Sequence, residues 1–450
     1  MGEGGAMGRR LTRQDFLLLS AGAGAGIVLA GCGGGPQSNP AVQGQGGGGG
    51  GKEYNGPKVD LAFWNGFTGG DGPYMQKLVA EFSANEKNIN VAMNTVDWTE
   101  YYQKVPAAVR AGKGPDLGIM HIDQLATNAA RGVIIPLDDV ANALKLKASD
   151  FAPIVWEAGI YNNHRYGIPL DMHPLGLYYN KGVMEKAGLD PEKPPQTKDD
   201  YMVALEQMKG KGIQGFWVSP LPFTGVLIWM SLIRQFGGDL YNDDATKATF
   251  NSDAGVDALS WMVDVVKQGY SPKNLAQDAE FTAFQNDKNA FMWNGIWNIN
   301  PLGAVKGLEW GAAPLPQIGT EKAAWSNSHN FVIMNKPGQD PNKIQASKVF
   351  INWISKRSIE WAKAGQVPAR KEVRDSQEFK SLTWQSEFAK EVPYIRFVPP
   401  VPGIADVELA SFDQAVNEAV LLKKDPKTAL DGATSRANQL LKENREKYQA

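Results

Sequence analysis

Apolar and polar residues follow one another in regular blocks near the start of the main body of the chain. Short apolar runs at residues 59–64, 91–96 and 116–120 have the length and composition of buried strands. Between them, residues 72–82 and 101–110 carry apolar side chains at the spacing of one face of a helix. This alternation predicts an α/β fold in which a mostly parallel sheet has helices on both faces.

The second half of the chain is predicted to be richer in helix. Thr197, with Asp200 three residues later, can cap the start of a helix. Apolar stripes with helical spacing then run through residues 256–266, 344–354, 409–420 and 430–440. The roughly 390 residues from residue 57 onward exceed the length that one hydrophobic core usually organises, so we expect two domains.

The first 31 residues have the features of an export signal. Basic residues up to Arg13 precede an apolar run at residues 16–30, which is shorter than a helix that spans a bilayer. Leu29-Ala30-Gly31-Cys32 then matches the lipobox of bacterial lipoproteins, in which the cysteine becomes the lipidated first residue. We therefore predict a signal peptide at residues 1–31 and a lipid anchor at Cys32, which would hold the exported protein at the outer face of the cytoplasmic membrane. An N-terminal membrane helix with a chance cysteine is the alternative, and the short apolar run disfavours it.

A glycine-rich segment joins this anchor to the body. Residues 32–56 cannot bury a core, so we predict a flexible tether. Cys32 is the only cysteine in the chain, so the body can have neither a disulfide bond nor a cysteine-based metal site. The formal net charge of −2 disfavours nucleic acid as a partner.

Candidate binding residues follow the predicted strands. In open parallel sheets, ligands bind beyond the carboxyl ends of the strands, which here are residues 65–71, 97–98 and 121–124. These segments and the strand end before them combine aromatic and polar side chains, namely Trp64, Asn65, Phe67, Thr68, Asp71, Asp97, Trp98, His121 and Asp123. Aromatic faces beside fixed hydrogen-bonding groups suit a polyol ring. The alternative is that Trp64 belongs to the core and Asp71 only caps a helix.

Seven short motifs point to a known family. They are FWNGFT at 63–68, GKGPD at 112–116, GIPLD at 167–171, LYYNK at 177–181, MWNGIW at 292–297, GAAPLP at 311–316 and VPAR at 367–370. In this order they resemble the extracellular solute-binding proteins of family 1, the sugar-binding components of bacterial ABC importers. The resemblance covers essentially all of residues 57–450.

The resemblance implies a periplasmic-binding-protein-like fold with two α/β lobes, each with a mostly parallel sheet. The chain would cross a hinge near Asp171, Asn294 and Gln339. One lobe would hold residues 57–170 and 296–338, and the other residues 171–295 and 339–450. A monomer would clamp a sugar in the cleft between the lobes, and the membrane permease would recognise the closed form.

The resemblance also adds residues to the expected cleft. These are Asp171, His173, Trp229 within the stretch 223–229, Trp293, Gly295, Trp297, His329, Asn330 and Arg370. Family members often carry glycines before the strand at Phe331, whereas Ser326-Asn327-Ser328-His329 stands here. Of the thirteen tryptophans, Trp261, Trp353 and Trp361 lie in predicted helices and are expected in the core.

Three other functions fit some of the same residues. A glycoside hydrolase would use two carboxylates among Asp71, Asp97, Asp123 and Asp171, but nothing in the sequence marks one acid as the proton donor. A glycerol phosphate would need several cationic groups, and the expected cleft holds Arg370 alone. A metal site could use His121, His173 and His329, three of the four histidines, although no HxxxH spacing supports it. We therefore expect no catalysis, no metal and no cofactor.

Overall fold

The computed structural model describes residues 53–220 and 224–448. The predicted signal peptide, Cys32 and nearly all of the tether lie outside the described residues. Within the described ranges, no helix combines the length and the apolar character that crossing a membrane requires.

The first sheet has five strands and carries the alternation predicted from the sequence. Its order is β2 (Ile89–Thr95), β1 (Val59–Asn65), β3 (Leu117–His121), β11 (His329–Ile333) and β6 (Ile168–Pro169). Strand β1 runs parallel to β2 and β3, and β11 runs antiparallel to β3 and β6. The three predicted strands are confirmed, and their carboxyl ends meet at one edge of the sheet.

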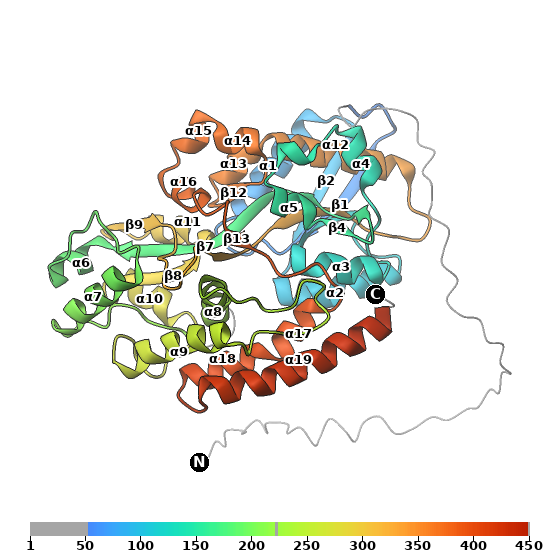
Figure 1. Ribbon diagram of the computed structural model, residues 1–450. Helices are drawn as coiled ribbons and strands as arrows, with labels where there is room; N and C mark the ends of the chain where they lie inside the picture. Colours follow the sequence, from blue (N-terminus) through green and yellow to red (C-terminus); the bar gives the residue numbers. More distant parts are fainter. Residues whose placement is uncertain (1–52, 221–223, 449–450) are drawn as a thin grey trace, which may run out of the picture. The chain divides into compact units, whose positions relative to one another are not determined.

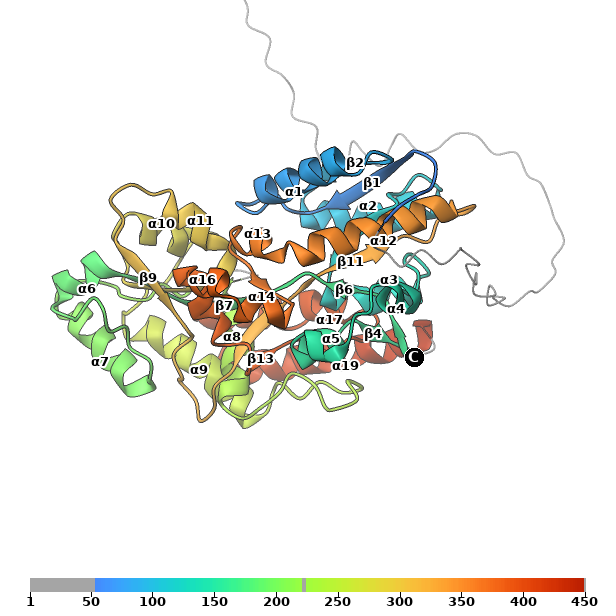
Figure 2. The same ribbon diagram turned by 90° about the horizontal axis from the view of Figure 1, so that it is seen from above.

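Helices pack on this sheet around a core centred on Phe63. The ring of Phe63 contacts those of Phe331 and Phe350, with ring centroids 6.4 and 5.3 Å apart. Phe350 belongs to α12, which lies beside β1 in both views (Figures 1 and 2). The elements around this sheet are α1 (Gly72–Asn85), α2 (Trp98–Arg110), α3 (Ile122–Ala130), α4 (Asp138–Ala143), η1 (Ala148–Asp150), α5 (Pro153–Glu157), α12 (Pro341–Lys356) and α13 (Ser358–Ala362). A short hairpin of β4 (Ile160–Tyr161) and β5 (His164–Arg165) completes this part.

The second sheet is built on β7 (Asp171–Asn180), whose ten residues are all buried. Four strands pair with β7, all antiparallel: β8 (Phe291–Gly295), β9 (Trp310–Ala313), β10 (Ala324–Asn327) and β12 (Val367–Pro368). Strand β13 (Ile395–Arg396) runs parallel to β10. The expectation of a mostly parallel sheet is therefore wrong for this half, because a buried apolar strand has the same composition in either direction.

The remaining helices surround this second sheet. They are α6 (Lys181–Ala187), α7 (Lys198–Lys209), α8 (Thr224–Gln235), α9 (Asp253–Lys267), α10 (Ala279–Gln285), η2 (Ile296–Asn298), α11 (Ile299–Gly303), α14 (Lys371–Asp375), α15 (Gln377–Lys380), α16 (Thr383–Ala389), α17 (Ile404–Ala410), α18 (Phe412–Val420) and α19 (Pro426–Tyr448). Thr197 caps α7 as predicted, since its side chain accepts a hydrogen bond from the Asp200 amide. The stripe at 409–420 is divided at Ser411 between α17 and α18, and Leu409 is exposed rather than buried.

The strand pairs differ from the expected division into lobes. Strands β9 and β10 belong to the second sheet, although residues 296–338 were expected with residues 57–170. Helix α12 packs on β1 of the first sheet, although residues 339–450 were expected in the other lobe. The expected division was wrong on these points because the resemblance rests on the order of motifs along the chain, and that order does not determine which strands pair.

Two of the passages of the chain between the two sheets are only one residue long. Leu170 alone separates β6 from β7, and Ser328 alone separates β10 from β11. Asp171 and His329 therefore lie directly beside the points where the chain crosses. The predicted crossing near Asp171 agrees with this arrangement. Asn294, near which another crossing was predicted, lies within β8, and both β8 and the following β9 pair with β7.

Candidate ligand-binding site

A pocket of about 530 Å³ lies where elements of both halves meet. The first half contributes the loop after β1, the end of β3 and the start of α2. The second half contributes β7, η2, β10, α8, α17 and α18. The predicted site residues that line this pocket are Thr68, Asp71, Trp98, His121, Asp123, His173, Trp297 and His329.

Three indoles supply much of the aromatic surface of the pocket, and two of them rest on glycines. A Cβ atom on Gly66 would lie 2.0 Å from the ring of Trp98, and one on Gly295 would lie 2.0 Å from the ring of Trp297. The rings of Trp297 and Trp325 meet edge to face, with centroids 6.5 Å apart. The two glycines thus permit an approach that any other residue would block.

Two of the predicted cleft tryptophans lie in the core instead. Trp229 is fully buried in α8, packs on Phe250 and Phe412, and donates its ring N–H to the backbone of Gly255. Trp293 is buried in β8 and stacks on Trp261. The expectation that these two indoles face the cleft is wrong, because each side chain points to the interior face of its element.

Arg370 and Asn330 also lie away from the pocket lining. The Arg370 guanidinium is buried and donates to the Ser355 hydroxyl at 2.6 Å. Asn330 is buried in β11, and its amide donates to the Ser328 carbonyl oxygen. Both side chains hold the chain in place beside the site.

Other predicted residues support the pocket from behind. The Asn65 side-chain oxygen Oδ1 accepts from the Phe67 amide and the Thr95 hydroxyl, which shapes the loop after β1. The Phe67 ring is buried against Trp98 and Trp361. Trp64 packs beside the core around Tyr101, Asp97 caps α2 through the Thr99 amide, and Gly295 lies beneath Trp297.

Several residues of the pocket were not predicted from the sequence. Trp325 and Asn327 lie on β10, and Gln366 lies just before β12. Glu408 comes from α17 and Asp413 from α18. Apolar side chains of α8 and of the chain after β13 also line the pocket, namely Val226, Leu227, Met230, Phe397, Val398, Leu409 and Phe412. No local signal marks the helical residues, because acids among apolar positions are ordinary in amphipathic helices.

Asn327 belongs to the stretch before Phe331 in which the resemblance led us to expect glycines, and it joins the two halves. Its side-chain oxygen accepts from the backbone amides of Ile122 and Ser328, at 3.0 and 2.8 Å. Its amide group donates to Asp123 at 2.8 Å. A glycine could make none of these contacts, so this position fixes the wall of the pocket.

The carboxyl groups that line the pocket hold their protons more tightly than usual. Burial raises the pKa of Asp71 and of Asp123. Burial, together with the charges of Asp123 and Asp413, raises the pKa of Glu408 well above its usual value. Burial also raises the pKa of Asp413 to about 6. Asp71 was expected to bind the ligand, with a role as a helix cap as the alternative. Its side chain makes no capping hydrogen bond to α1.

Asp171 has the opposite character. Burial alone would raise its pKa, but the neighbouring His329 and His173 lower it below the usual value. Its two oxygens accept from the ring nitrogens of His329 at 2.8 Å and His173 at 3.3 Å, and from the Trp361 ring N–H at 2.7 Å. The His329 amide is a fourth donor, at 3.0 Å. Trp361 is buried as predicted, and it also orients this carboxylate.

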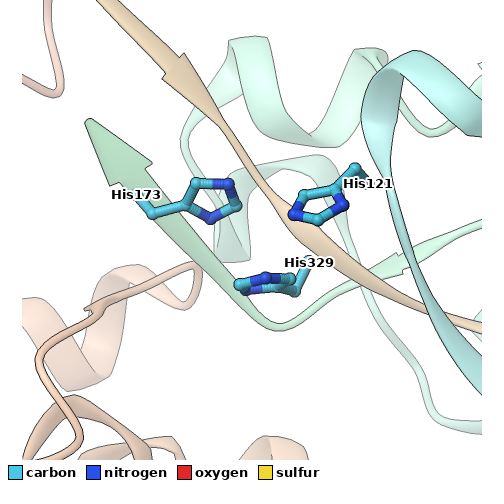
Figure 3. A group of neighbouring side chains, drawn as sticks. All are labelled: His121, His173 and His329. Atoms are coloured by element: carbon cyan, nitrogen blue, oxygen red, sulfur yellow. The ribbon is translucent and has the colours of Figure 1, made fainter. Parts of the chain in front are cut away.

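The three histidines expected in the cleft lie together at the pocket wall. Figure 3 shows their rings turned toward a common space, from the end of β3, from β7 and from the start of β11. One ring nitrogen from each of His121, His173 and His329 lies within 4.8 Å of the others. Burial and the neighbouring imidazoles lower the pKa of His173 to about 4 and that of His121 well below its usual value.

Three oxygens that line the pocket lack a hydrogen-bond partner among the described residues. They are Oδ1 of Asp71, Oε1 of Gln366 and Oε1 of Glu408, and all three are buried. A buried acceptor without a donor costs free energy, so native proteins rarely leave one unless a ligand or water satisfies it. The pocket is therefore suited to a ligand that carries several hydroxyl donors.

Comparisons with known proteins agree with this geometry. The sequence matches the profile of the bacterial extracellular solute-binding proteins over residues 77–384. The maltotriose-binding protein of Pyrococcus abyssi is 23% identical over 377 residues, 82% of this chain and 78% of that protein. The sn-glycerol-3-phosphate-binding periplasmic protein of Shigella flexneri is 24% identical over 416 residues, 85% of this chain and 92% of that protein.

A solved structure shares the fold. The ABC transporter solute-binding protein of Thermotoga lettingae, bound with α-D-tagatose, matches at a TM-score of 0.74 and 25% identity, over 85% of this chain and 100% of that chain. The two-lobe α/β fold expected from the motifs is thus confirmed, with the strand pairing described above. The chain belongs to the bacterial extracellular solute-binding proteins.

Proposed function

We propose that this protein captures a neutral sugar in its pocket and delivers it to the permease of an ABC importer. The observation that carries this proposal is the lining of the pocket. Indoles of Trp98, Trp297 and Trp325 line it together with buried oxygens that have no hydrogen-bond partner among the described residues. Indoles pack on the C–H faces of a sugar ring, and the oxygens accept from its hydroxyl groups.

The charge of the pocket favours a neutral ligand over a phosphate. The described residues that line the pocket include no lysine or arginine. They do include four acidic residues, Asp71, Asp123, Glu408 and Asp413. A phosphate is usually bound by cationic or backbone N–H donors, and carboxylates beside it would repel it. The proposed ligand therefore differs from that of the glycerol-phosphate-binding relative.

The proposed mechanism is capture by closure. The pocket draws side chains from both sheets, so a sugar held there would contact both halves at once. Such contacts stabilise a closed arrangement by the difference in ligand affinity between the open and closed forms. The permease would bind the closed form, and no covalent bond of the sugar would be broken.

A ligand panel tests the proposed function. Neutral mono-, di- and trisaccharides and sn-glycerol 3-phosphate are added separately to the purified chain, and the melting temperature is recorded. A ligand that binds only the folded state raises this temperature by mass action, and calorimetry then gives its affinity. A rise with at least one neutral sugar is expected. A rise with glycerol phosphate alone would replace the proposal, and cleavage of a bound oligosaccharide on long incubation would make the protein a hydrolase.

We also propose that Cys32 carries a lipid that anchors the exported protein to the outer face of the membrane. The Leu-Ala-Gly-Cys sequence and the glycine-rich segment after it support this. Metabolic labelling with a fatty acid should mark the wild-type protein but not Cys32→Ser, which should still bind sugar. Equal labelling of both would exclude Cys32 as the anchor. Gel filtration tests the expected monomeric state.

A further inference from the structure

Three imidazoles that are far apart in the sequence converge on one space in the fold. His121, His173 and His329 come from three different strands, and their ring centroids lie 4.3 to 5.4 Å from one another (Figure 3). One nitrogen of each lies within 4.8 Å of the other two. The two short crossings at Leu170 and Ser328 bring these strand ends together.

Each of the three rings has a polar partner at Nδ1, as histidines that bind a metal usually do. Nδ1 of His329 and Nδ1 of His173 donate to Asp171. Nδ1 of His121 lies 2.6 Å from the Tyr102 hydroxyl. Metal-binding histidines usually use one ring nitrogen for a carboxylate, a carbonyl or another polar partner and leave the second for the ion. Here Nδ1 of each ring has such a partner, so an ion would be bound through Nε2.

Asp171 holds two of the rings at once. Its carboxylate is further fixed by the Trp361 ring N–H and by the His329 backbone amide. The buried carboxylate also supplies negative charge next to the space that the imidazoles enclose. Both the orientation and the charge favour a cation there.

The size of the cluster fits a small ion after a modest contraction. Tetrahedral zinc at about 2.0–2.1 Å from each nitrogen places the nitrogens roughly 3.4 Å apart. Moving each nitrogen by about 1 Å toward their common centre would close the present separation of up to 4.8 Å. All three histidines also line the pocket, so one coordination position would face the pocket.

We propose that His121, His173 and His329 bind one divalent transition-metal ion, for which Zn²⁺ is the best match, with its fourth position open to the pocket. Imidazole ligands suit zinc and its neighbours in the first transition series, whereas calcium and magnesium prefer oxygen ligands. The site goes beyond sugar capture and does not depend on it. It also replaces the expectation from sequence spacing that the protein binds no metal.

Calorimetry on the full-length chain tests the site. The protein is purified without a histidine tag, treated with a chelator and dialysed, and Zn²⁺ is then titrated into it. His164 provides the matched control, because it is the fourth histidine, is exposed and pairs with Asp138 on the surface. One Zn²⁺ per chain is expected for the wild type and for His164→Gln. His121→Gln, which changes the least buried of the three, should weaken binding at least about 100-fold.

Either of two results would overturn the site. One is a wild-type affinity weaker than about 100 µM, and the other is equal affinity in His121→Gln and the wild type. Replacing Zn²⁺ by Co²⁺ gives a readout that needs no variant. Tetrahedral Co²⁺ absorbs visible light strongly, so a strong spectrum is expected with the wild-type chain. If the wild-type chain leaves Co²⁺ with the weak spectrum of the hydrated ion, the proposed site is wrong.

Discussion

The backbone of Gly295 lies against the indole of Trp297 so closely that a Cβ atom there would be 2.0 Å from the ring. Gly66 stands in the same relation to Trp98. Each glycine ends or follows a strand at the pocket, and each indole forms part of the pocket surface. The position of both aromatic surfaces is therefore set by the absence of a side chain beneath them.

The first prediction is that Gly295→Ala weakens sugar binding. The added methyl group would push the Trp297 ring from its place, and such overpacking costs about 1–3 kcal/mol. We expect about a tenfold or greater loss of affinity by calorimetry. Gly303→Ala is the control, because a Cβ atom there meets nothing within 4 Å. If the two variants bind the sugar equally well, Trp297 is not a contact surface.

The second prediction compares two neighbouring tryptophans. Trp297→Ala should cost roughly 2–4 kcal/mol of binding free energy, about thirtyfold to a thousandfold in affinity, because it removes a stacking surface. Trp293→Ala should instead cost about 3–5 kcal/mol of folding free energy, because that ring is buried in the core against Trp261. Calorimetry and chemical denaturation of both variants separate the two effects. An unchanged affinity in Trp297→Ala would place the sugar elsewhere.

The sequence predicts only part of the pocket. Trp98, His121 and Asp123 were found because the carboxyl ends of parallel strands meet at one edge, a rule that needs only the strand positions. Trp293 was misplaced because an aromatic residue in a buried strand can face either side. The motif around it does not tell which side contacts the core.

Other parts of the site depend on contacts that no local pattern encodes. Glu408 reaches the pocket because α17 and α18, near the end of the chain, pack against α8 and α3. The three histidines meet because two one-residue connections bring distant strands together. Such relations follow from the tertiary fold, so helix and strand prediction alone does not give them.

The third prediction concerns the support of Asp171. Trp361→Phe removes the ring N–H that donates to this buried carboxylate at 2.7 Å. A hydrogen bond to a charged group contributes about 1.5–3 kcal/mol. Trp261→Phe is the control, because the Trp261 ring N–H has no partner among the described residues. Chemical denaturation should show that the free energy of unfolding falls by about 1.5–3 kcal/mol more in Trp361→Phe than in Trp261→Phe. Equal losses in the two variants would mean that the hydrogen bond contributes nothing.

The fourth prediction is that Glu391 lowers stability as the pH rises. Burial raises its pKa well above the usual value of 4.5, although the Leu315 amide donates to it. Below pH 4.5 the folded and unfolded chains both hold this proton. Above pH 4.5 the unfolded chain releases it first, so folding is disfavoured by about 1.4 kcal/mol per pH unit until the folded pKa is reached.

Glu391→Gln should therefore match the wild type near pH 4.5 and exceed it in stability at pH 8, because glutamine has nearly the same volume and never ionises. The free energy of unfolding of both proteins is measured by denaturant titration at several pH values between these limits. Glu387→Gln is the control, since Glu387 is partly exposed and pairs with Lys390 at the surface. The difference between Glu391→Gln and the wild type should grow with pH, while the difference for Glu387→Gln should stay nearly constant. A difference for Glu391→Gln that does not grow would mean that this carboxyl group ionises in the folded protein at its ordinary pKa.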